Sequence, residues 1–327
     1  MSEDKLLQIN DLSVEYHAGN QIVRAVSNLS MEVGLGETLG FVGETGAGKT
    51  TTALSILRIL PDPPSKITGG EIFFNGTDLL KKTPDEMRRV RGKEIAMIFQ
   101  DPMTSLDPVI TVNKQIQEMI SLHEKITPKE AADKAEAMLE VVGIKKERAN
   151  DFPHQFSGGM KQRVVIAIAL ACNPKLLIAD EPTTALDVTI QAQVLELMKE
   201  LKSKYKMSMI MITHDLGIVA EICDKVAIMY AGNIVEYGTV EQIYENHKHP
   251  YTTALFNSIP SIDSQIEELS VIPGLPPDPT NLPPGCPFNP RCKYVENACI
   301  TNAPGNFGVE PGHFVRCIKC SGGESRL

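Results

Sequence analysis

The sequence predicts an α/β fold with a mainly parallel sheet and helices on both of its faces. Residues 6–42 hold short apolar runs, LLQINDLSVEY, IVRAV, LSMEV and TLGFVG, broken by Gly, Asn and His, which is typical of several strands. Later strand-like runs, KLLIAD, MSMIMIT and KVAIMYAG, are separated by stretches compatible with helices. Because this alternation is the pattern of strand-helix-strand units, it favours a parallel sheet.

A helix is predicted between these two strand-rich regions, from Thr127 to Gly143. Thr127 is a suitable N-cap, Pro128 fits the first helical position, and Glu130 completes a capping box. Gly143 provides a stop signal at the other end. We expect a helical subdomain over about residues 101–160 that contains this segment.

The C-terminal part differs in composition from the rest of the chain. Ten prolines and few aliphatic residues lie between Val271 and Cys320, so this segment cannot build an apolar core of its own. The expected organisation is a main domain over residues 1–260, with a boundary in the stretch Tyr251 to Asp263, and a C-terminal region over residues 261–327. No internal repeat is found.

Length, composition and charge limit the class of protein. The 327 residues suffice for two domains, and 42% hydrophobic and 22% charged residues indicate an ordinary globular chain. The formal net charge of -9 disfavours a general nucleic-acid binder. The longest apolar run, Val164 to Cys172, is too short to cross a bilayer, and the N-terminus lacks the pattern of a secretory signal.

A phosphate-binding loop is predicted at GETGAGKT, Gly43 to Thr50, between an apolar strand and a helix-like stretch. The glycines allow backbone N–H groups to wrap phosphates, and the N-terminus of the helix adds positive potential. Lys49 can reach the outer phosphates and Thr50 can hold Mg²⁺. The residues expected at the nucleotide are Gly43, Glu44, Thr45, Gly46, Ala47, Gly48, Lys49, Thr50 and Thr51.

Two carboxylates follow the buried run KLLIA. Asp180 suits a magnesium ligand, and Glu181 suits a general base for the attacking water. An acidic cap between a strand and a helix is the alternative, which the phosphate loop disfavours.

Two further strand ends carry polar side chains that would reach the same edge of the sheet. His214 follows MSMIMIT, and we expect it to sense or stabilise the terminal phosphate rather than to serve only the fold. Gln100 follows the run AMIF and offers an amide to Mg²⁺ or water, although an exposed glutamine without a role is equally common at such positions.

A second anion site is predicted at FSGGMKQR, Phe156 to Arg163, which opens another helix. Ser157, Gly158 and Gly159 offer a hydroxyl group and bare N–H groups at a helix N-terminus. Since the first loop already holds one nucleotide's phosphates, the chain carries two half-sites. A head-to-tail dimer that encloses ATP between the loop of one subunit and the serine-glycine helix of the other is the simplest solution.

With these motifs in this order, residues 6–260 resemble the ATP-binding cassette (ABC) family. The resemblance implies an ABC ATPase core with an antiparallel β-subdomain and an inserted helical subdomain. It makes Glu181, His214 and Gln100 the catalytic residues, and Thr50, Gln100 and Asp180 the magnesium ligands. Tyr16 would stack on adenine, with an ordinary strand tyrosine as the alternative. In trans the nucleotide would meet Ser157, Gly158, Gly159, Gln162 and Asp187.

Three stretches resemble the peptide and nickel importer branch of that family: FQDPMTSLDPVITV, FPHQFSGGMKQR and HPYTTALFNSIP. The resemblance implies an ATPase on the cytoplasmic face of the membrane, as a peripheral subunit. Its partners would be a second ATPase subunit, expected to be a paralogue with a homodimer in isolation as the alternative, two transmembrane permease subunits and, indirectly, an extracytoplasmic substrate-binding protein. Candidate residues for docking the permeases are Met103, Thr104, Leu106 and Val109, with a place in the helical core as their alternative.

Five cysteines lie near the C-terminus, and their wide spacing suits a metal centre larger than one ion. Four thiolates can bind a [4Fe-4S] cluster, and nearby basic residues would offset its charge. Relatives in the branch with a similar cysteine pattern support this expectation. The expected ligands are Cys286, Cys292, Cys299 and Cys317, with Cys320 as an alternative for the fourth, and structural Zn²⁺ or free thiols as alternatives to the cluster.

An ATP-driven importer of di- or oligopeptides is the function that the resemblance implies, and two other functions are its alternatives. A soluble ABC ATPase that acts on nucleic acid or ribosomes is disfavoured by the family resemblance. Ribosome-acting relatives usually carry two cassettes in one chain, and chromosome-acting relatives insert a long coiled coil between the phosphate loop and Ser157, which here follows Thr50 by only 107 positions. A GTPase or nucleotide kinase is disfavoured because no guanine-reading N-K-x-D follows Asn113.

Overall fold

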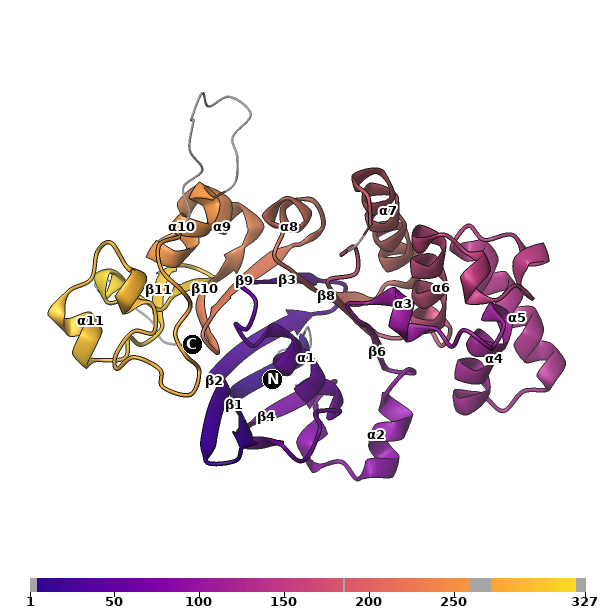
Figure 1. Cartoon of the computed structure of the whole chain (residues 1–327), viewed down its shortest axis with the longest axis horizontal. Coiled ribbons are helices and arrows are strands. Elements are labelled where there is room, and N and C mark those ends of the chain that lie inside the picture. Colours follow the sequence, from indigo (N-terminus) through magenta and orange to yellow (C-terminus); the bar gives the residue numbers. More distant parts are fainter. Residues whose placement is uncertain (1–4, 185, 259–271, 322–327) are drawn as a thin grey trace. The chain divides into compact units, whose positions relative to one another are not determined.

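The computed structural model describes residues 5–184, 186–258 and 272–321, without the side chains of Pro102 and Met103. These residues form two compact units (Figure 1). The first comprises the described residues of Met1–Leu6, Val33–Thr38 and Lys81–Ile212, and the second those of Leu7–Glu32, Leu39–Leu80 and Thr213–Leu327. The predicted domain boundary near residue 260 lies outside the described residues.

Three parallel strands form the sheet of the first unit: β6 (Ile95–Ile98), β7 (Leu176–Asp180) and β8 (Ser208–Thr213). Leu176 of the central strand β7 pairs with Ile95 on one side and with Ser208 on the other. Every residue of β7 and β8 is buried. Because both faces of these strands are covered, their sequences are continuous apolar runs rather than alternating ones.

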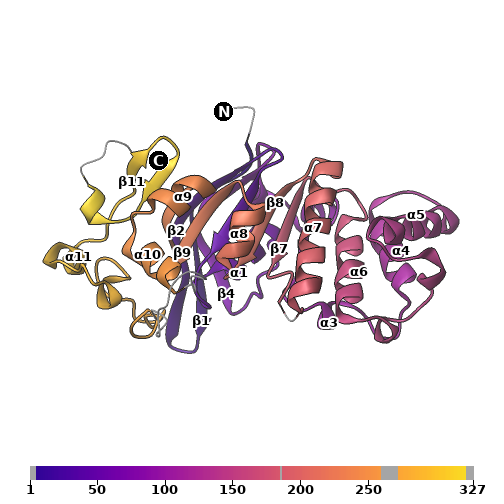
Figure 2. The same ribbon diagram turned by 90° about the horizontal axis from the view of Figure 1, so that it is seen from above.

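Helices make up most of the rest of the first unit. They are α2 (Pro84–Val90), α3 (Pro102–Ser105), α4 (Val112–His123), α5 (Pro128–Val141), α6 (Gly158–Leu170) and α7 (Val188–Tyr205), with short 3₁₀ turns at Leu79–Lys81, Lys146–Arg148 and Pro153–Gln155. Figures 1 and 2 show α6 between α7 and the pair α4 and α5, and it contacts all three. This position explains why α6 is apolar nearly all round.

The predicted mid-chain helix is confirmed as α5. The hydroxyl group of Thr127 accepts a hydrogen bond from the Glu130 N–H at 3.3 Å, and the Glu130 carboxylate accepts one from the Thr127 N–H at 2.8 Å. Gly143 has a φ of +79°, and its N–H bonds to the Glu140 carbonyl at 2.9 Å. Start and stop signals therefore act as the sequence predicts.

The second unit contains an antiparallel sheet in the order β2-β1-β4-β5. Its strands are β1 (Lys5–Ala18), β2 (Gln21–Gly34), β4 (Ser65–Phe74) and β5 (Thr77–Asp78). Strand β1 pairs with β4 in antiparallel register, with Leu7 opposite Phe74 and Tyr16 opposite Ser65. The strands predicted near the N-terminus and the antiparallel β-subdomain implied by the resemblance are both present.

A parallel pair, β3 (Thr38–Val42) and β9 (Lys225–Tyr230), leads into three antiparallel strands of the second unit. These are β10 (Asn233–Thr239), β12 (His313–Val315) and β11 (Phe307–Glu310). Two of the three come from the C-terminal region. The helices of this unit are α1 (Lys49–Leu57), α8 (Leu216–Ile222), α9 (Val240–Asn246), α10 (Pro250–Asn257) and α11 (Asn297–Thr301), with 3₁₀ turns η4 (Asn289–Arg291) and η5 (Ile318–Cys320).

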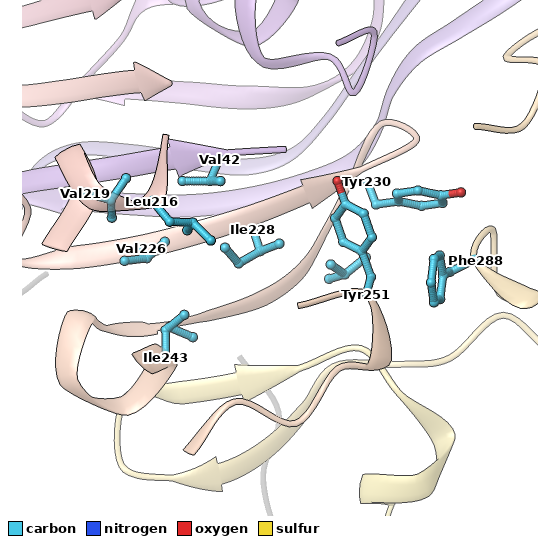
Figure 3. Packing of buried hydrophobic residues seen from close by; sticks show 10 residues of the cluster. Val42, Leu216, Val219, Val226, Ile228, Tyr230, Ile243, Tyr251 and Phe288 are labelled. Carbon is cyan, nitrogen blue, oxygen red and sulfur yellow. The ribbon is translucent and has the colours of Figure 1, made fainter. Parts of the chain in front are cut away.

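Within the second unit, the C-terminal region packs against the remaining elements through a shared apolar core (Figure 3). Phe288 is 2% exposed and lies against Tyr230 and Tyr251, with ring centroids 5.2 and 5.4 Å apart. The proline-rich segment therefore depends on apolar partners from β9 and α10, as expected of a sequence with few aliphatic residues. Among the described residues, no helix has the length and apolar character to span a bilayer.

Candidate functional site

The predicted phosphate loop joins β3 to α1 in the second unit. A Cβ atom on Gly48 would lie 2.3 Å from the Ala25 carbonyl oxygen, and φ there is +104°, so only glycine fits. The Lys49 Nζ donates hydrogen bonds to the carbonyls of Gly43 and Glu44, at 2.6 and 3.1 Å. Thr45, Gly46 and Thr50 are exposed. The loop thus presents small residues and a buried ammonium group at a helix N-terminus, which is suited to phosphate binding.

Glu44 is bound through its backbone to α10 and through its side chain to the C-terminal region. Its N–H donates to the hydroxyl group of Tyr251 at 3.0 Å. Its carboxylate forms a bidentate ion pair with Arg291, in which the two terminal nitrogens of the guanidinium group lie 2.7 and 3.0 Å from the carboxylate oxygens. The hydrogen bonds that Arg291 donates to the Glu44 carboxylate raise the pKa of Arg291, whereas burial raises that of Tyr251. Arg291 was expected only among the basic residues beside the cysteines, and its pairing with Glu44 was not predicted, because the two lie 247 positions apart and no local pattern marks the pairing.

Tyr16 lies in β1 of the same unit and is half-buried. Its hydroxyl group is 3.4 Å from the Thr51 hydroxyl group, in the first turn of α1. The structure therefore brings the predicted adenine contact close to the helix that begins at the phosphate loop.

Asp180 and Glu181 end β7 in the first unit. Asp180 is 3% exposed, whereas Glu181 is half-buried and has a φ of +46°, a rare conformation for a residue other than glycine. The Glu181 carboxylate accepts hydrogen bonds from the Gln100 amide at 3.1 Å and from the Thr184 hydroxyl group at 3.0 Å. Two predicted catalytic residues, Gln100 and Glu181, thus meet, and backbone strain of this kind concentrates at functional sites.

His214 directly follows β8 and is exposed. The next residue, Asp215, caps α8 by accepting hydrogen bonds from the N–H groups of Gly217 and Ile218 at 2.7 and 3.4 Å. His214 is therefore held at a strand-to-helix junction, which is where the sequence analysis expects it.

The predicted second anion site lies on the first unit. Ser157 caps α6 by accepting a hydrogen bond from the Met160 N–H at 3.4 Å, and both Ser157 and Gly158 are exposed. A Cβ atom on Gly159 would lie 2.4 Å from the Ile190 Cγ2 of α7, so glycine permits this close packing.

The other two residues expected in trans differ in exposure. Asp187 is exposed and caps α7 through a hydrogen bond from the Ile190 N–H at 3.0 Å. Gln162, by contrast, is completely buried within the α6 packing and does not lie on the surface with Ser157. Its position, one turn into a helix covered on every side, accounts for this.

The candidate docking residues are split between surface and core. Val109 is 78% exposed and Thr104 is exposed, but Leu106 is only 5% exposed. Leu106 therefore lies in the core, which is the alternative expected for these residues. The side chain of Met103 lies outside the described part of the chain.

Four of the cysteines, Cys286, Cys292, Cys299 and Cys317, line one cavity of the second unit together with Lys319, and Cys320 is not part of its lining. Burial raises the pKa of the Cys317 thiol to about 11. Within residues 5–184, 186–258 and 272–321, however, no group of three or more His, Cys, Asp or Glu side chains is arranged to hold a metal ion. The structure thus groups the thiols without establishing a metal-binding extension, and the cluster stays a prediction.

Family models match two parts of the chain. One described as "ABC transporter" matches residues 26–184, and another, "Oligopeptide/dipeptide transporter, C-terminal region", matches residues 235–299. The first match includes the phosphate loop, Ser157 and Glu181, and the second includes Arg291 and three of the cysteines that line the cavity.

Similar proteins match nearly the whole chain. The oligopeptide transport ATP-binding protein OppD of Bacillus subtilis is 52% identical over 315 residues, which cover 95% of this chain and 88% of the relative. The dipeptide transport ATP-binding protein DppD of the same organism is 48% identical over 316 residues, or 96% of this chain and 94% of the relative. These matches do not favour the nucleic-acid or ribosome alternative.

Among solved structures, a dimeric post-hydrolysis state of the ATP-binding cassette MJ0796 bound to ADP and Pi matches with a TM-score of 0.65 and 25% identity. It covers 72% of this chain and 98% of the matched chain. The chain therefore belongs to the ABC transporter family, as an ATP-hydrolysing subunit of the branch that carries the oligopeptide/dipeptide transporter C-terminal region.

Proposed function

We propose that this chain powers a bacterial importer of di- or oligopeptides from the cytoplasmic face of the membrane. ATP binding closes two ATPase subunits, this movement drives two separate permease subunits, and hydrolysis resets them. The printed names of the relatives and the matched C-terminal region support peptides as the cargo. The net charge of -9 agrees with a partner set that contains no nucleic acid.

The proposed catalytic role rests on the position of the Glu181 carboxylate. Gln100 and Thr184 donate hydrogen bonds to it, directly after the buried strand β7. A general base must be held in place to remove a proton from the attacking water. In this proposal Glu181 accepts that proton, and Gln100 orients the water or assists in binding Mg²⁺. His214 stabilises the charge on the terminal phosphate.

The nucleotide is bound by residues of both half-sites. We assign Gly43 to Thr51, with Lys49 at the outer phosphates, to one subunit, and Tyr16 to the adenine. The hydroxyl group of Thr50 and the carboxylate of Asp180 are oxygen ligands of the kind that Mg²⁺ prefers. The exposed Ser157 and Gly158 at the start of α6 support a contribution in trans, together with Gly159 and Asp187. Gln162 would have to leave its buried position to take part.

The partner subunits are a second ATPase, which we expect to be a paralogue, and two permeases. Val109 and Thr104 supply exposed surface beside the helical elements for the permeases. An extracytoplasmic binding protein would deliver the cargo to the permeases. Such a division of labour agrees with a chain that selects no cargo itself.

We further propose that the cavity lined by Cys286, Cys292, Cys299 and Cys317 holds a [4Fe-4S] cluster. The donor set supports this, because four cysteine thiolates are the usual ligands of such a cluster. Structural Zn²⁺ bound by the same thiolates is the alternative. When bound, the cluster would stabilise a segment that has little apolar core of its own.

Affinity purification from native membranes tests the transport function. Two membrane-embedded subunits should co-purify with the tagged protein. Cells that carry Lys49→Ala should fail to take up labelled di- or tetrapeptides. Stable association with ribosomes, or peptide uptake unaffected by Lys49→Ala, would contradict the proposal.

Anaerobic purification tests the cluster. We expect a brown sample with broad absorption near ~400 nm and about four irons per chain. A colourless sample with zinc as its metal would reject the cluster in favour of a structural zinc site.

A further inference from the structure

One contact in the second unit links the phosphate loop to a residue outside every motif of the ATPase core. Arg291 is the last residue of η4, in the cysteine-rich region, and its side chain is only 5% exposed. Its guanidinium group forms the bidentate ion pair with Glu44, the second residue of the phosphate loop. We propose that Arg291 is a positioning residue for ATP binding, which holds Glu44 and thereby the phosphate loop in the conformation that receives the nucleotide.

The hydrogen bonds around Glu44 show how firmly this residue is held. Its N–H donates to Tyr251, its carbonyl accepts from Lys49 and from the Ala47 N–H at 3.1 Å each, and its carboxylate accepts from Arg291. A residue fixed at its N–H, its carbonyl and its side chain cannot change its backbone angles freely. Because the loop binds phosphate through backbone N–H groups, fixing Glu44 before ATP arrives lowers the entropy lost on binding.

Arg291 is itself anchored on several sides. Its Nε donates to the Pro273 carbonyl at 3.0 Å, one of its terminal nitrogens lies 3.3 Å from the Tyr230 hydroxyl group, and the guanidinium carbon is 5.8 Å from the centre of the Tyr230 ring. With its side chain 5% exposed, the guanidinium group is committed to these partners and to Glu44. It therefore acts through Glu44 and is not a catalytic residue.

The buried ion pair is poor evidence for a purely stabilising role. A buried pair costs so much desolvation that apolar side chains of equal volume often stabilise a fold as well or better. A bidentate arginine-carboxylate pair instead fixes the orientation of the two side chains relative to each other. The same short segment also contributes Cys292, directly after Arg291, to the lining of the cysteine cavity. This segment thus contacts both the cysteine cavity and, through Arg291, the phosphate loop.

The inference rests on the proposed ATP site and is tested by nucleotide affinity. Arg291→Met keeps an apolar stem of similar length but removes the guanidinium group. We expect it to weaken ATP binding about tenfold, with a smaller effect on turnover at saturating ATP. Glu44→Gln should weaken binding to a similar extent, the double variant should bind no worse than either single variant, and Arg291→Lys should recover part of the loss.

Arg316→Met is the matched control. Arg316 is a second arginine of the C-terminal region, and it donates to the Pro304 carbonyl at 3.0 Å and to Asn233 at 2.7 Å, without contacting the loop. It should lower the melting temperature yet change ATP affinity less than about twofold. Equal losses of affinity in Arg291→Met and Arg316→Met, or unchanged affinity in both Arg291→Met and Glu44→Gln, would overturn the inference.

Two further results keep the outcome interpretable. If Arg291→Met does not fold, Glu44→Gln alone decides, because the Glu44 side chain is 27% exposed and Gln keeps its shape and one hydrogen-bond acceptor for Arg291. Unaltered ATP affinity in Glu44→Gln would then reject the positioning role. A wild-type chain that binds ATP no better than Lys49→Ala would instead overturn the proposed function, and the inference with it.

Discussion

Acid should destabilise this protein through one buried histidine, His249, which begins helix α10. His249 is 1% exposed, and its Nδ1 accepts a hydrogen bond from the Tyr251 N–H at 3.1 Å. An acceptor nitrogen must be unprotonated, so the folded state requires neutral His249. Burial lowers its pKa to about 4, against the opposing attraction of the Glu236 carboxylate.

The size and sign of the effect follow from this shift. In the unfolded chain a histidine takes up its proton near pH ~6.5. Between pH ~6.5 and ~4 the unfolded state therefore binds more protons than the folded state, and the free energy of unfolding falls as the pH falls. A shift from 6.5 to about 4 corresponds to a loss of up to about 3 kcal/mol. Above pH ~6.5 this contribution is fully present.

Urea unfolding at a series of pH values measures this dependence. His249→Asn retains an acceptor for the Tyr251 N–H but cannot titrate, so we expect a much shallower loss between pH ~6.5 and ~4.5. His154→Asn, a change at an exposed histidine, should behave like the wild type. The acid response of Glu236, whose pKa is lowered on balance by hydrogen bonds from His313 and neighbouring N–H groups despite its burial, falls below that range. Equal slopes for His249→Asn and the wild type would refute the reasoning.

Three other predictions concern the loop, the surface and the second half-site. Gly48→Ala should lower the free energy of unfolding by several kcal/mol, since its Cβ would lie 2.3 Å from the Ala25 carbonyl oxygen. Gly46→Ala, with no atom within 4 Å of its Cβ, should lose only the ~1–2 kcal/mol of a left-handed residue; similar losses in urea unfolding would contradict the clash. Val109→Asp should reduce co-purification of the permeases without changing ATP affinity, and undiminished co-purification would remove Val109 from the docking surface. Ser157→Arg should abolish ATP turnover but leave binding to the loop of the same chain, as seen by a fluorescent ATP analogue, and full turnover would exclude a role in trans.

Local signals explain why much of the fold was predictable. The capping box of Thr127 and Glu130 and the stop at Gly143 act within a few residues, so their effect can be read without knowledge of distant contacts. The meeting of Gln100 and Glu181 follows from topology, because both end neighbouring parallel strands at the same edge of a sheet.

Features that depend on residues far away in the sequence could not be predicted from it. Leu106 and Val109 stand three positions apart in one irregular stretch, and only the packing of the helices decides that one is buried and the other exposed. Likewise nothing near Arg291 indicates that its partner is Glu44, and the pairing of β12 with β10 joins Val315 to Glu236 across most of the C-terminal region. Such contacts are set by the whole fold and not by local sequence.

Glu181→Gln is the most direct test of the central claim, which is that the Glu181 carboxylate accepts a proton from the attacking water during ATP hydrolysis. In the purified ATPase assembly, the account predicts that turnover falls by at least about a hundredfold while ATP affinity stays within about twofold of the wild type. Glu196→Gln, a change at an exposed glutamate on α7, should turn over ATP normally. Wild-type turnover in Glu181→Gln, measured with ATP binding intact, would contradict the account.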